Sequence, residues 1–341
     1  MNPRIFIGPM SKNVVDAAIA CANKRQMPLG LIPSRRQVDY NSGYVNHWTT
    51  DTFSKYVKSQ SKFILLERDH GGPSQGAKQD PGYDSFCVDC NYLDVVHIDP
   101  WKEADSHTWG TDLTKEYLEF CYRQNPRLRF EVGTEQAIYE YSADQLEWML
   151  ARLQHELPYI FDNVIYAVIQ SGTAIQGTQN VGTYSEQRLK DMIAVCQKYG
   201  LKSKEHNGDY LNISDIKNKF DLGLDAINIA PEFGVTETDI LLEHIEKSGN
   251  DKLLLQFYDL CFASGKWKKW MPVNYLPKRR WGVGTSTSDE IKKIIRVSGH
   301  YVFSDQQFRF IIKKLQKQYP SIQEEIKNRL MMKINALLDL C

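Results

Sequence analysis

The stretch Phe63-Ile-Leu-Leu-Glu-Arg-Asp-His-Gly-Gly-Pro73 contains the pattern that decides the fold. Four apolar residues lead directly into charged residues, and two glycines and a proline follow, which is typical of a buried strand that ends in a loop. The pattern recurs along the first two thirds of the chain. Eight apolar runs are predicted as strands, at residues 5–8, 29–33, 63–66, 95–98, 129–132, 164–169, 201–204 and 226–229.

Segments with apolar residues at helical spacing lie between these runs. Ser142 and Gln145 form a capping-box pattern at the start of one of them. Eight strands about 30 residues apart that alternate with helices favour a closed (β/α)8 TIM barrel, with an open doubly wound sheet as the alternative. The helices are expected at 14–22, 50–57, 113–122, 143–157, 185–199, 213–220 and 237–245.

The pattern changes after Gly249, where only helical segments are expected, at 253–262, 288–297, 304–315 and 322–338. We therefore divide the chain into a (β/α)8 barrel at 1–248 and a helical C-terminal extension at 249–341. A basic stretch rich in tryptophan, residues 267–281, joins these helices. Its tryptophans are expected to dock the extension on the barrel.

Composition excludes several classes of protein. The 341 residues are 42% hydrophobic and 25% charged, which are globular values. Basic and acidic residues both number 42, so no net field favours nucleic acid or an anionic membrane as a partner. No apolar run approaches the length of a membrane span. Seven cysteines without a framework spacing favour free thiols, and hence a cytoplasmic protein.

Polar residues follow almost every predicted strand, at the end of the barrel where TIM-barrel active sites lie. Two histidines and several carboxylates at one rim predict a divalent metal site for zinc or manganese. The candidate metal ligands are His70, His206, Glu135 and Glu232. The candidate catalytic residues are Asp69, Asp99 and Glu135, one of which would move a proton while the metal stabilises an enediolate.

Further polar residues at the same rim are candidates for binding substrate. Guanidinium groups of Arg35, Arg36 and Arg68 could bind a phosphate or carboxylate. The other candidate substrate-binding residues are Gln37, Gln170, Asn228 and Asp209.

Several of these motifs resemble the class II D-tagatose-bisphosphate aldolase non-catalytic subunit family and, more distantly, the class II fructose- and tagatose-bisphosphate aldolases. The matching pieces are Ser11-Lys-Asn-Val-Val-Asp-Ala-Ala18, Gln37-Val-Asp-Tyr-Asn-Ser-Gly-Tyr44, Asp69-His-Gly-Gly-Pro73, His97-Ile-Asp99, Gly133-Thr-Glu135, Glu205-His-Asn-Gly-Asp-Tyr210 and Asn228. The resemblance implies a TIM barrel that acts on a sugar or sugar phosphate. It also implies that Asp69 is the general acid and that His70 and His206 bind metal.

The chain departs from the aldolases at two places. Gly172-Thr-Ala-Ile-Gln-Gly177 lacks the third histidine ligand, and Asn207-Gly-Asp-Tyr210 and Asn228-Ile-Ala-Pro231 lack the aldolase phosphate loops. Aldol cleavage or condensation and epimerisation therefore both stay open. So does a non-catalytic role, in which the chain stabilises a catalytic aldolase subunit. A homo-oligomer is a further alternative.

Overall fold

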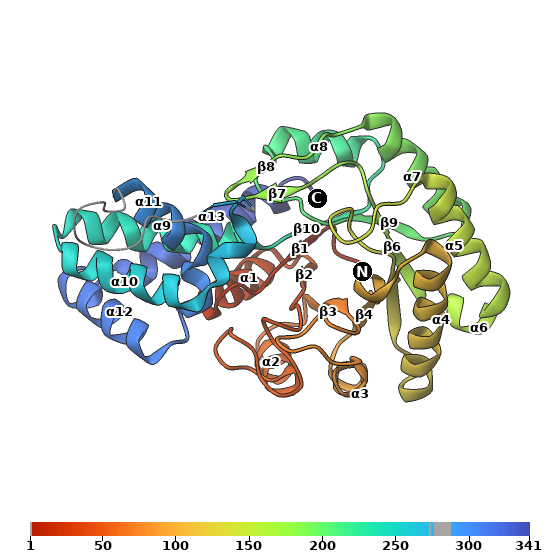
Figure 1. Cartoon of the computed structure of the whole chain (residues 1–341), viewed down its shortest axis with the longest axis horizontal. Coiled ribbons are helices and arrows are strands. Elements are labelled where there is room, and N and C mark those ends of the chain that lie inside the picture. The colour runs from red at the N-terminus through yellow and green to blue at the C-terminus, as the bar shows by residue number, and fades with distance from the viewer. Residues whose placement is uncertain (1, 273, 276–287) are drawn as a thin grey trace.

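The computed structural model describes residues 2–272, 274–275 and 288–341, and it contains a closed barrel of eight parallel strands (Figure 1). The strand order around the barrel is β1-β10-β9-β6-β5-β4-β3-β2. All eight predicted strands are confirmed, and β3 continues beyond its predicted end into the charged residues. The strands are β1 (Ile5–Ile7), β2 (Leu29–Leu31), β3 (Ile64–Gly71), β4 (Val95–Ile98), β5 (Arg129–Val132), β6 (Val164–Ile169), β9 (Lys202–Glu205) and β10 (Ala226–Ile229).

Helices surround the barrel, and all seven predicted barrel helices are present. The capping box at Ser142 and Gln145 is confirmed. Helix α3 was not predicted, because its sequence is rich in weak helix formers such as Asp, Asn and Cys. The helices are α1 (Lys12–Arg25), α2 (Thr50–Lys58), α3 (Tyr83–Tyr92), α4 (His107–Gln124), α5 (Ala143–Glu156), α6 (Pro158–Phe161), α7 (Glu186–Lys198), α8 (Ile213–Asp221) and α9 (Pro231–Lys247).

The C-terminal residues form further helices beside α1 and α9 (Figure 1). Helix α13 packs on both α1 and α9, and α9 also contacts α10 and α11. The predicted domain boundary at 248 therefore falls between two helices that pack together. The elements are α10 (Asp251–Ser264), the 3-10 helix η2 (Lys266–Trp270), α11 (Ser288–Ser298), η3 (Gly299–Val302), α12 (Gln306–Gln318) and α13 (Ile322–Leu338).

The tryptophan-rich stretch is described only in part. Trp267 and Trp270 are buried in the same core as the barrel helices. The backbone carbonyl of Trp270 accepts a hydrogen bond of 2.9 Å from the amide of Gly177, in the hairpin of β7 (Ile175–Gln176) and β8 (Gln179–Asn180) that follows β6. Lys278, Arg279, Arg280 and Trp281 lie outside the described residues.

Two different layers of side chains fill the barrel. The first is apolar and made by Phe6, Ile32, Leu65, Val95, Tyr166 and Ala226. Residues two positions further along a strand point to the same side, one step closer to the C-terminal rim. On β3, β4 and β10 these next residues are Glu67, His97 and Asn228. The barrel interior therefore changes from apolar to charged toward the rim.

None of the helices within the described ranges is long and apolar enough to cross a membrane.

Candidate metal centre

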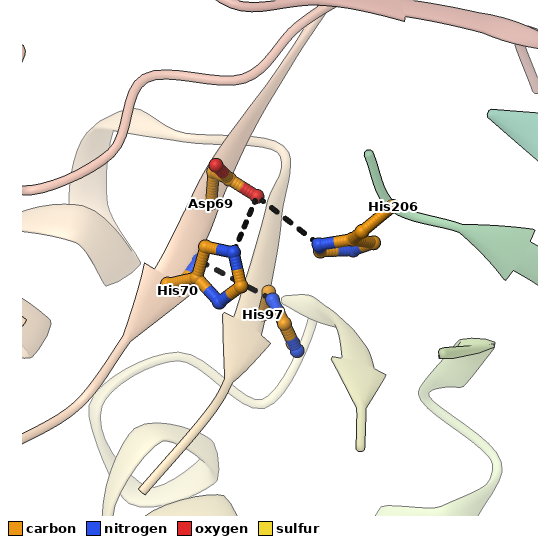
Figure 2. A group of neighbouring side chains, drawn as sticks. All are labelled: Asp69, His70, His97 and His206. Atoms are coloured by element: carbon orange, nitrogen blue, oxygen red, sulfur yellow. Dashed lines mark hydrogen bonds and ion pairs between the residues drawn. The ribbon is translucent and has the colours of Figure 1, made fainter. Parts of the chain in front are cut away.

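The backbone at Asp69 and His70 departs from a regular strand. The register between β3 and β4 shifts between Arg68 and Gly71, and His70 has a φ of 49°. In a regular strand, neighbouring side chains point to opposite faces. The irregularity allows Asp69 and His70 both to face the mouth of the barrel (Figure 2).

Asp69, His70, His97 and His206 bring four ligand atoms within 4.8 Å of one another. They come from β3, from β4 and from the residue after β9 (Figure 2). Asp69 Oδ1 lies 3.8 Å from His70 Nε2 and 3.7 Å from His206 Nδ1. Two imidazoles thus face the same carboxylate oxygen.

Hydrogen bonds indicate which imidazole nitrogen is available in His70 and His206. His70 Nδ1 lies 2.5 Å from Oδ2 of Asp99, and His206 Nε2 lies 3.0 Å from Oε1 of Glu131. Each of these nitrogens must carry a proton to donate to its carboxylate, which leaves the other nitrogen directed at Asp69. Histidine ligands of metals commonly donate their second N–H to a carboxylate in this way.

His97 belongs to the same group, but both of its ring nitrogens are hydrogen-bonded to the protein backbone. Its Nε2 donates to the carbonyl of Gly133 at 2.9 Å, and its Nδ1 accepts a hydrogen bond of 3.2 Å from the backbone amide of His70. Burial lowers its pKa, so the ring is neutral. Because both nitrogens already have protein partners, His97 holds the backbone of His70 and has no lone pair left for a metal.

Glu135 and Asn228 complete the surroundings of Asp69 and His70. Glu135 Oε2 lies 3.7 Å from His70 Nε2 and accepts a hydrogen bond of 2.6 Å from Asn207. Asn228 Nδ2 donates to Asp69 Oδ1 at 3.4 Å, whereas its Oδ1 is buried without a protein partner among the described residues. An oxygen atom without a partner beside two imidazoles and two carboxylates fits a bound cation.

The electrostatics of His70 favour a positive charge at this place. Burial opposes the charged imidazole, but the carboxylates of Asp69, Asp99 and Glu135 outweigh it and raise the pKa of His70 to about 10. Burial also opposes the charged form of Asp99, yet its hydrogen bond to His70 keeps the pKa of Asp99 below its usual value. The site thus holds more negative charge than one imidazolium balances.

A buried ion network lies directly beneath the centre. Lys204 Nζ contacts Glu67 Oε2 at 2.7 Å and Glu131 Oε2 at 2.8 Å, and none of the three side chains is more than 1% exposed. Lys204 also lies 3.8 Å from the centre of the Phe6 ring. Glu131 therefore connects Lys204 on one side with His206 on the other, which fixes the orientation of that imidazole.

The structure corrects the prediction that Arg35 and Arg68 bind substrate. Both side chains are buried, and all five N–H groups of each have protein acceptors. Arg35 is bound by Asp39, Asp80 and the carbonyl of Gly72. Arg68 is bound by Asp89, Thr50 and the carbonyls of Pro33 and Val38. Neither has a donor left for a ligand, so both stabilise the loops around the mouth.

Gln37 and Gln170 are also tied to the protein. Gln37 is buried, and its Oε1 accepts from the amide of Ser34 at 2.7 Å. Gln170 donates to the carbonyls of Thr134 and Tyr139 and accepts from Tyr141 and Arg188. All four hydrogen bonds of its amide are made to protein groups, so Gln170 joins two loops.

Asp209, in the loop after β9, and Glu232, in the first turn of α9, do not belong to the four-residue group. Asp209 accepts from the amides of Ala230 and Glu232, and burial raises its pKa to about 7. Glu232 accepts from the amide of Tyr210 and forms an ion pair with Lys333 of α13. The predicted metal role of Glu232 and the predicted substrate role of Asp209 are therefore not supported: both groups join α9 to its neighbours.

The sequence-based site residues did not include His97, Glu131 and Lys204. Each lies within a strand, whereas the search considered mainly the residues after the strands. A charged or imidazole side chain inside a strand of four residues is unusual in a barrel core. This feature of the sequence could have identified the three residues as part of the site.

The chain matches no model of a known protein family and no curated protein. Its fold is similar to several solved structures. A probable tagatose 6 phosphate kinase from Sinorhizobium meliloti 1021 is 13% identical over 100% of both chains, with a TM-score of 0.72.

Two other similar structures cover 98% of this chain. The fructuronate-tagaturonate epimerase UxaE from Cohnella laeviribosi is 9% identical over 80% of its own chain, with a TM-score of 0.63. A fructose-bisphosphate aldolase from Campylobacter jejuni is 15% identical over 89% of its own chain, with a TM-score of 0.58. At these identities, the likeness shows a shared TIM-barrel fold.

Proposed function

We propose that this protein is a metal-dependent enzyme that acts on a sugar or sugar phosphate, as an aldolase or as an epimerase. The observation that carries the proposal is the pair of imidazole nitrogens, His70 Nε2 and His206 Nδ1, that face Oδ1 of Asp69. Proteins that share the fold include an aldolase and an epimerase. Both reactions need a group that stabilises negative charge beside a carbonyl carbon.

In this proposal, His70, His206 and Asp69 hold zinc or manganese, a mixed set of ligands that suits either ion. When bound, the cation supplies a Lewis acid for a sugar carbonyl or hydroxyl oxygen. The position of Asp69 between the imidazoles favours this role over the general-acid role that the resemblance implied. Asp99 and Glu131 hold the proton on the far nitrogen of each imidazole.

Glu135 is the group placed to move a proton. It is partly exposed to the mouth, and Asn207 holds its Oε2. Its other oxygen, Oε1, is left to accept a proton from a substrate carbon or hydroxyl and to return it. Asp99 is fully buried and bound to His70, so it positions that ring and does not carry the proton.

The test is the metal content of the purified full-length chain, measured by inductively coupled plasma mass spectrometry. We expect close to one zinc or manganese per chain in the wild type and a loss in His70→Ala, His206→Ala and Asp69→Asn. His155→Ala is the matched control, because His155 is exposed on α5. A wild type that stays free of metal after incubation with both ions would overturn the proposal.

Turnover is tested next, on ketose phosphates for cleavage and on sugars and sugar acids for epimerisation. Glu135→Gln should retain metal and lose turnover. The alternative role as a non-catalytic subunit of an aldolase is supported by the absence of a histidine in 172–177. In that role, no substrate would turn over and His70→Ala would still stabilise the catalytic partner.

A further inference from the structure

We propose that Arg36, Lys266 and Lys269, with Lys102 nearby, form a second binding site at the mouth of the barrel, which takes the phosphate or carboxylate group of the sugar. The site is distinct from the metal ligands, and it brings together two loops of the barrel and the C-terminal part of the chain. It rests on the proposed function for the identity of the sugar, but the binding of an anion can be tested without it.

A cavity of about 290 Å³ supplies the geometry. Its lining contains the cations Arg36, Lys266 and Lys269 and no acidic residue, which makes it an electropositive pocket, and Lys102 lies outside this lining. Its lining comes from the β2–α2 loop, from Ala77, from the segment around η2 and from Tyr301 of η3. We call this cavity the anion pocket. The residues are Arg36, Ser42, Gly43, Tyr44, Ala77, Gly265, Lys266, Lys269 and Tyr301.

Contacts on both sides hold the η2 wall of the anion pocket against the barrel. The amide of Gly177 donates to the carbonyl of Trp270 at 2.9 Å, which ties η2 to the hairpin after β6. The Nε1 of Trp270 donates to the hydroxyl of Tyr301 at 3.2 Å, and the ring of Tyr301 lies 4.8 Å from that of Tyr44. Lys269, the neighbour of Trp270, is therefore held at the mouth by its surroundings.

The β2–α2 loop forms the opposite wall of the anion pocket, and its backbone is tightly packed. The amide of Tyr44 donates to the carbonyl of Arg36 at 3.1 Å, which closes the loop on itself. Ser42 has a φ of 125°, and a Cβ at Gly43 would lie 2.0 Å from the carbonyl oxygen of Gln37. A side chain at position 43 would clash with the backbone of Gln37, so this loop conformation requires glycine there.

The cations of this region have no carboxylate within ion-pair distance among the described residues, unlike Arg35 and Arg68 nearby. Arg36, Lys102 and Lys269 are all exposed to solvent. Even so, the pKa of Lys269 is lowered by desolvation and by Arg36, and the pKa of Lys102 by desolvation, Arg36 and Lys269. Three like charges close enough to repel one another would be stabilised by an anion between them.

Hydrogen bonds connect Lys102 to the metal centre. Lys102 donates to Oε1 of Gln75, and Nε2 of Gln75 donates to the carbonyl of Asp99 at 3.1 Å. Asp99 in turn binds His70. Lys269 is also attracted by Glu135 and Asp69. A sugar whose carbonyl end lies at His70 and Glu135 can therefore place an anionic end toward Lys102 and Lys269. The loop sequences 207–210 and 228–231 lack the aldolase phosphate motifs, which is consistent with an anion site elsewhere.

The experiment is calorimetric titration of the full-length protein with inorganic phosphate, in the metal-free form so that phosphate cannot bind through a metal. We expect Lys269→Met and Arg36→Met each to weaken phosphate binding about tenfold or more, since hydrogen bonds between charged partners are strong. Lys268→Met, on the same 3-10 helix but outside the lining, should change the affinity less than about twofold. Titrations with three sugars then identify the kind of site. Preferred binding of fructose 6-phosphate indicates a phosphate site, preferred binding of glucuronate indicates a carboxylate site, and equal binding of fructose indicates a site that needs no anion.

Equal losses of phosphate affinity in Lys268→Met and Lys269→Met would show that phosphate responds to the overall positive charge of the region and not to a defined site. That result would overturn the proposal, as would equal affinity for fructose and fructose 6-phosphate.

Thermal unfolding without phosphate separates effects on folding from effects on binding. Lys269→Met should unfold at or above the wild-type temperature, because like-charge repulsion is relieved. Phosphate should raise that temperature in the wild type and in Lys268→Met, and by less in Lys269→Met. Phosphate binding without metal binding would refute the metal centre alone, and the reverse result would refute the anion pocket alone.

Discussion

Glu67 and Glu131 both contact Lys204 inside the barrel, yet we predict that they carry different charges. Burial raises the pKa of Glu67 well above its usual value, and the neighbouring Glu131 adds to the shift against the attraction of Lys204. For Glu131, burial is outweighed by the positive charge of Lys204, which holds its pKa well below the usual value. The raised pKa of Glu67 favours its protonated form, which leaves the group of three without net charge.

The perturbation is a matched pair of isosteric substitutions, Glu67→Gln and Glu131→Gln. Glutamine resembles the protonated form of Glu67, so Glu67→Gln should lower the free energy of unfolding by no more than about 1 kcal/mol. Glu131→Gln removes the partner of a buried ammonium group, and breaking such a pair costs about 3–5 kcal/mol. It also removes the acceptor of the His206 N–H.

Urea denaturation at neutral pH measures both free energies of unfolding, and the metal content of the two variants gives a second measurement. We expect Glu131→Gln to bind metal about 10–100-fold more weakly, as is usual when the partner of a metal-binding histidine is lost. An infrared band of a protonated carboxyl group should be present in the wild type and missing in Glu67→Gln. Equal destabilisation by the two substitutions, or a greater effect of Glu67→Gln, would refute the assignment of charges.

Three further predictions concern other buried charges. Asp99→Asn should keep the fold but reduce metal affinity about 10–100-fold, measured by competition with a chelator, because His70 loses the carboxylate that orients it. Arg68→Lys should lower the free energy of unfolding by about 2–4 kcal/mol, since lysine cannot make five hydrogen bonds, whereas Arg123→Lys on the surface should have almost no effect. Burial, opposed by two hydrogen bonds, raises the pKa of Glu237 to about 7, so the folded state binds a proton that the unfolded state releases from about pH 4.5 upward. Wild-type stability should therefore fall relative to Glu237→Gln by about 2.5 kcal/mol between about pH 5 and pH 8, and a constant difference in urea denaturation across that range would contradict this.

The barrel could be predicted from the sequence because its signal is local and periodic. Short apolar runs such as 164–169 alternate with amphipathic segments, and parallel strands buried on both faces must be continuously apolar. The positions of His70 and His206 could be predicted for the same reason, since each directly follows an apolar run that ends at the rim. That they share a site follows from barrel topology alone.

Only the tertiary structure decided which of the polar residues face the candidate metal centre and which face other protein groups. Arg68, Asp69 and His70 are neighbours in the chain, but Arg68 binds Asp89, whereas the irregularity after Arg68 brings both Asp69 and His70 to the metal centre. Whether a charged group faces a ligand or another protein group depends on partners far away in sequence, as with Glu232 and Lys333, 101 residues apart. Local pattern carries no information about such pairs, whereas it does carry the periodicity of buried strands and helices. For this reason the sequence determined the barrel and its rim, and the packing of distant segments determined the roles of the residues on it.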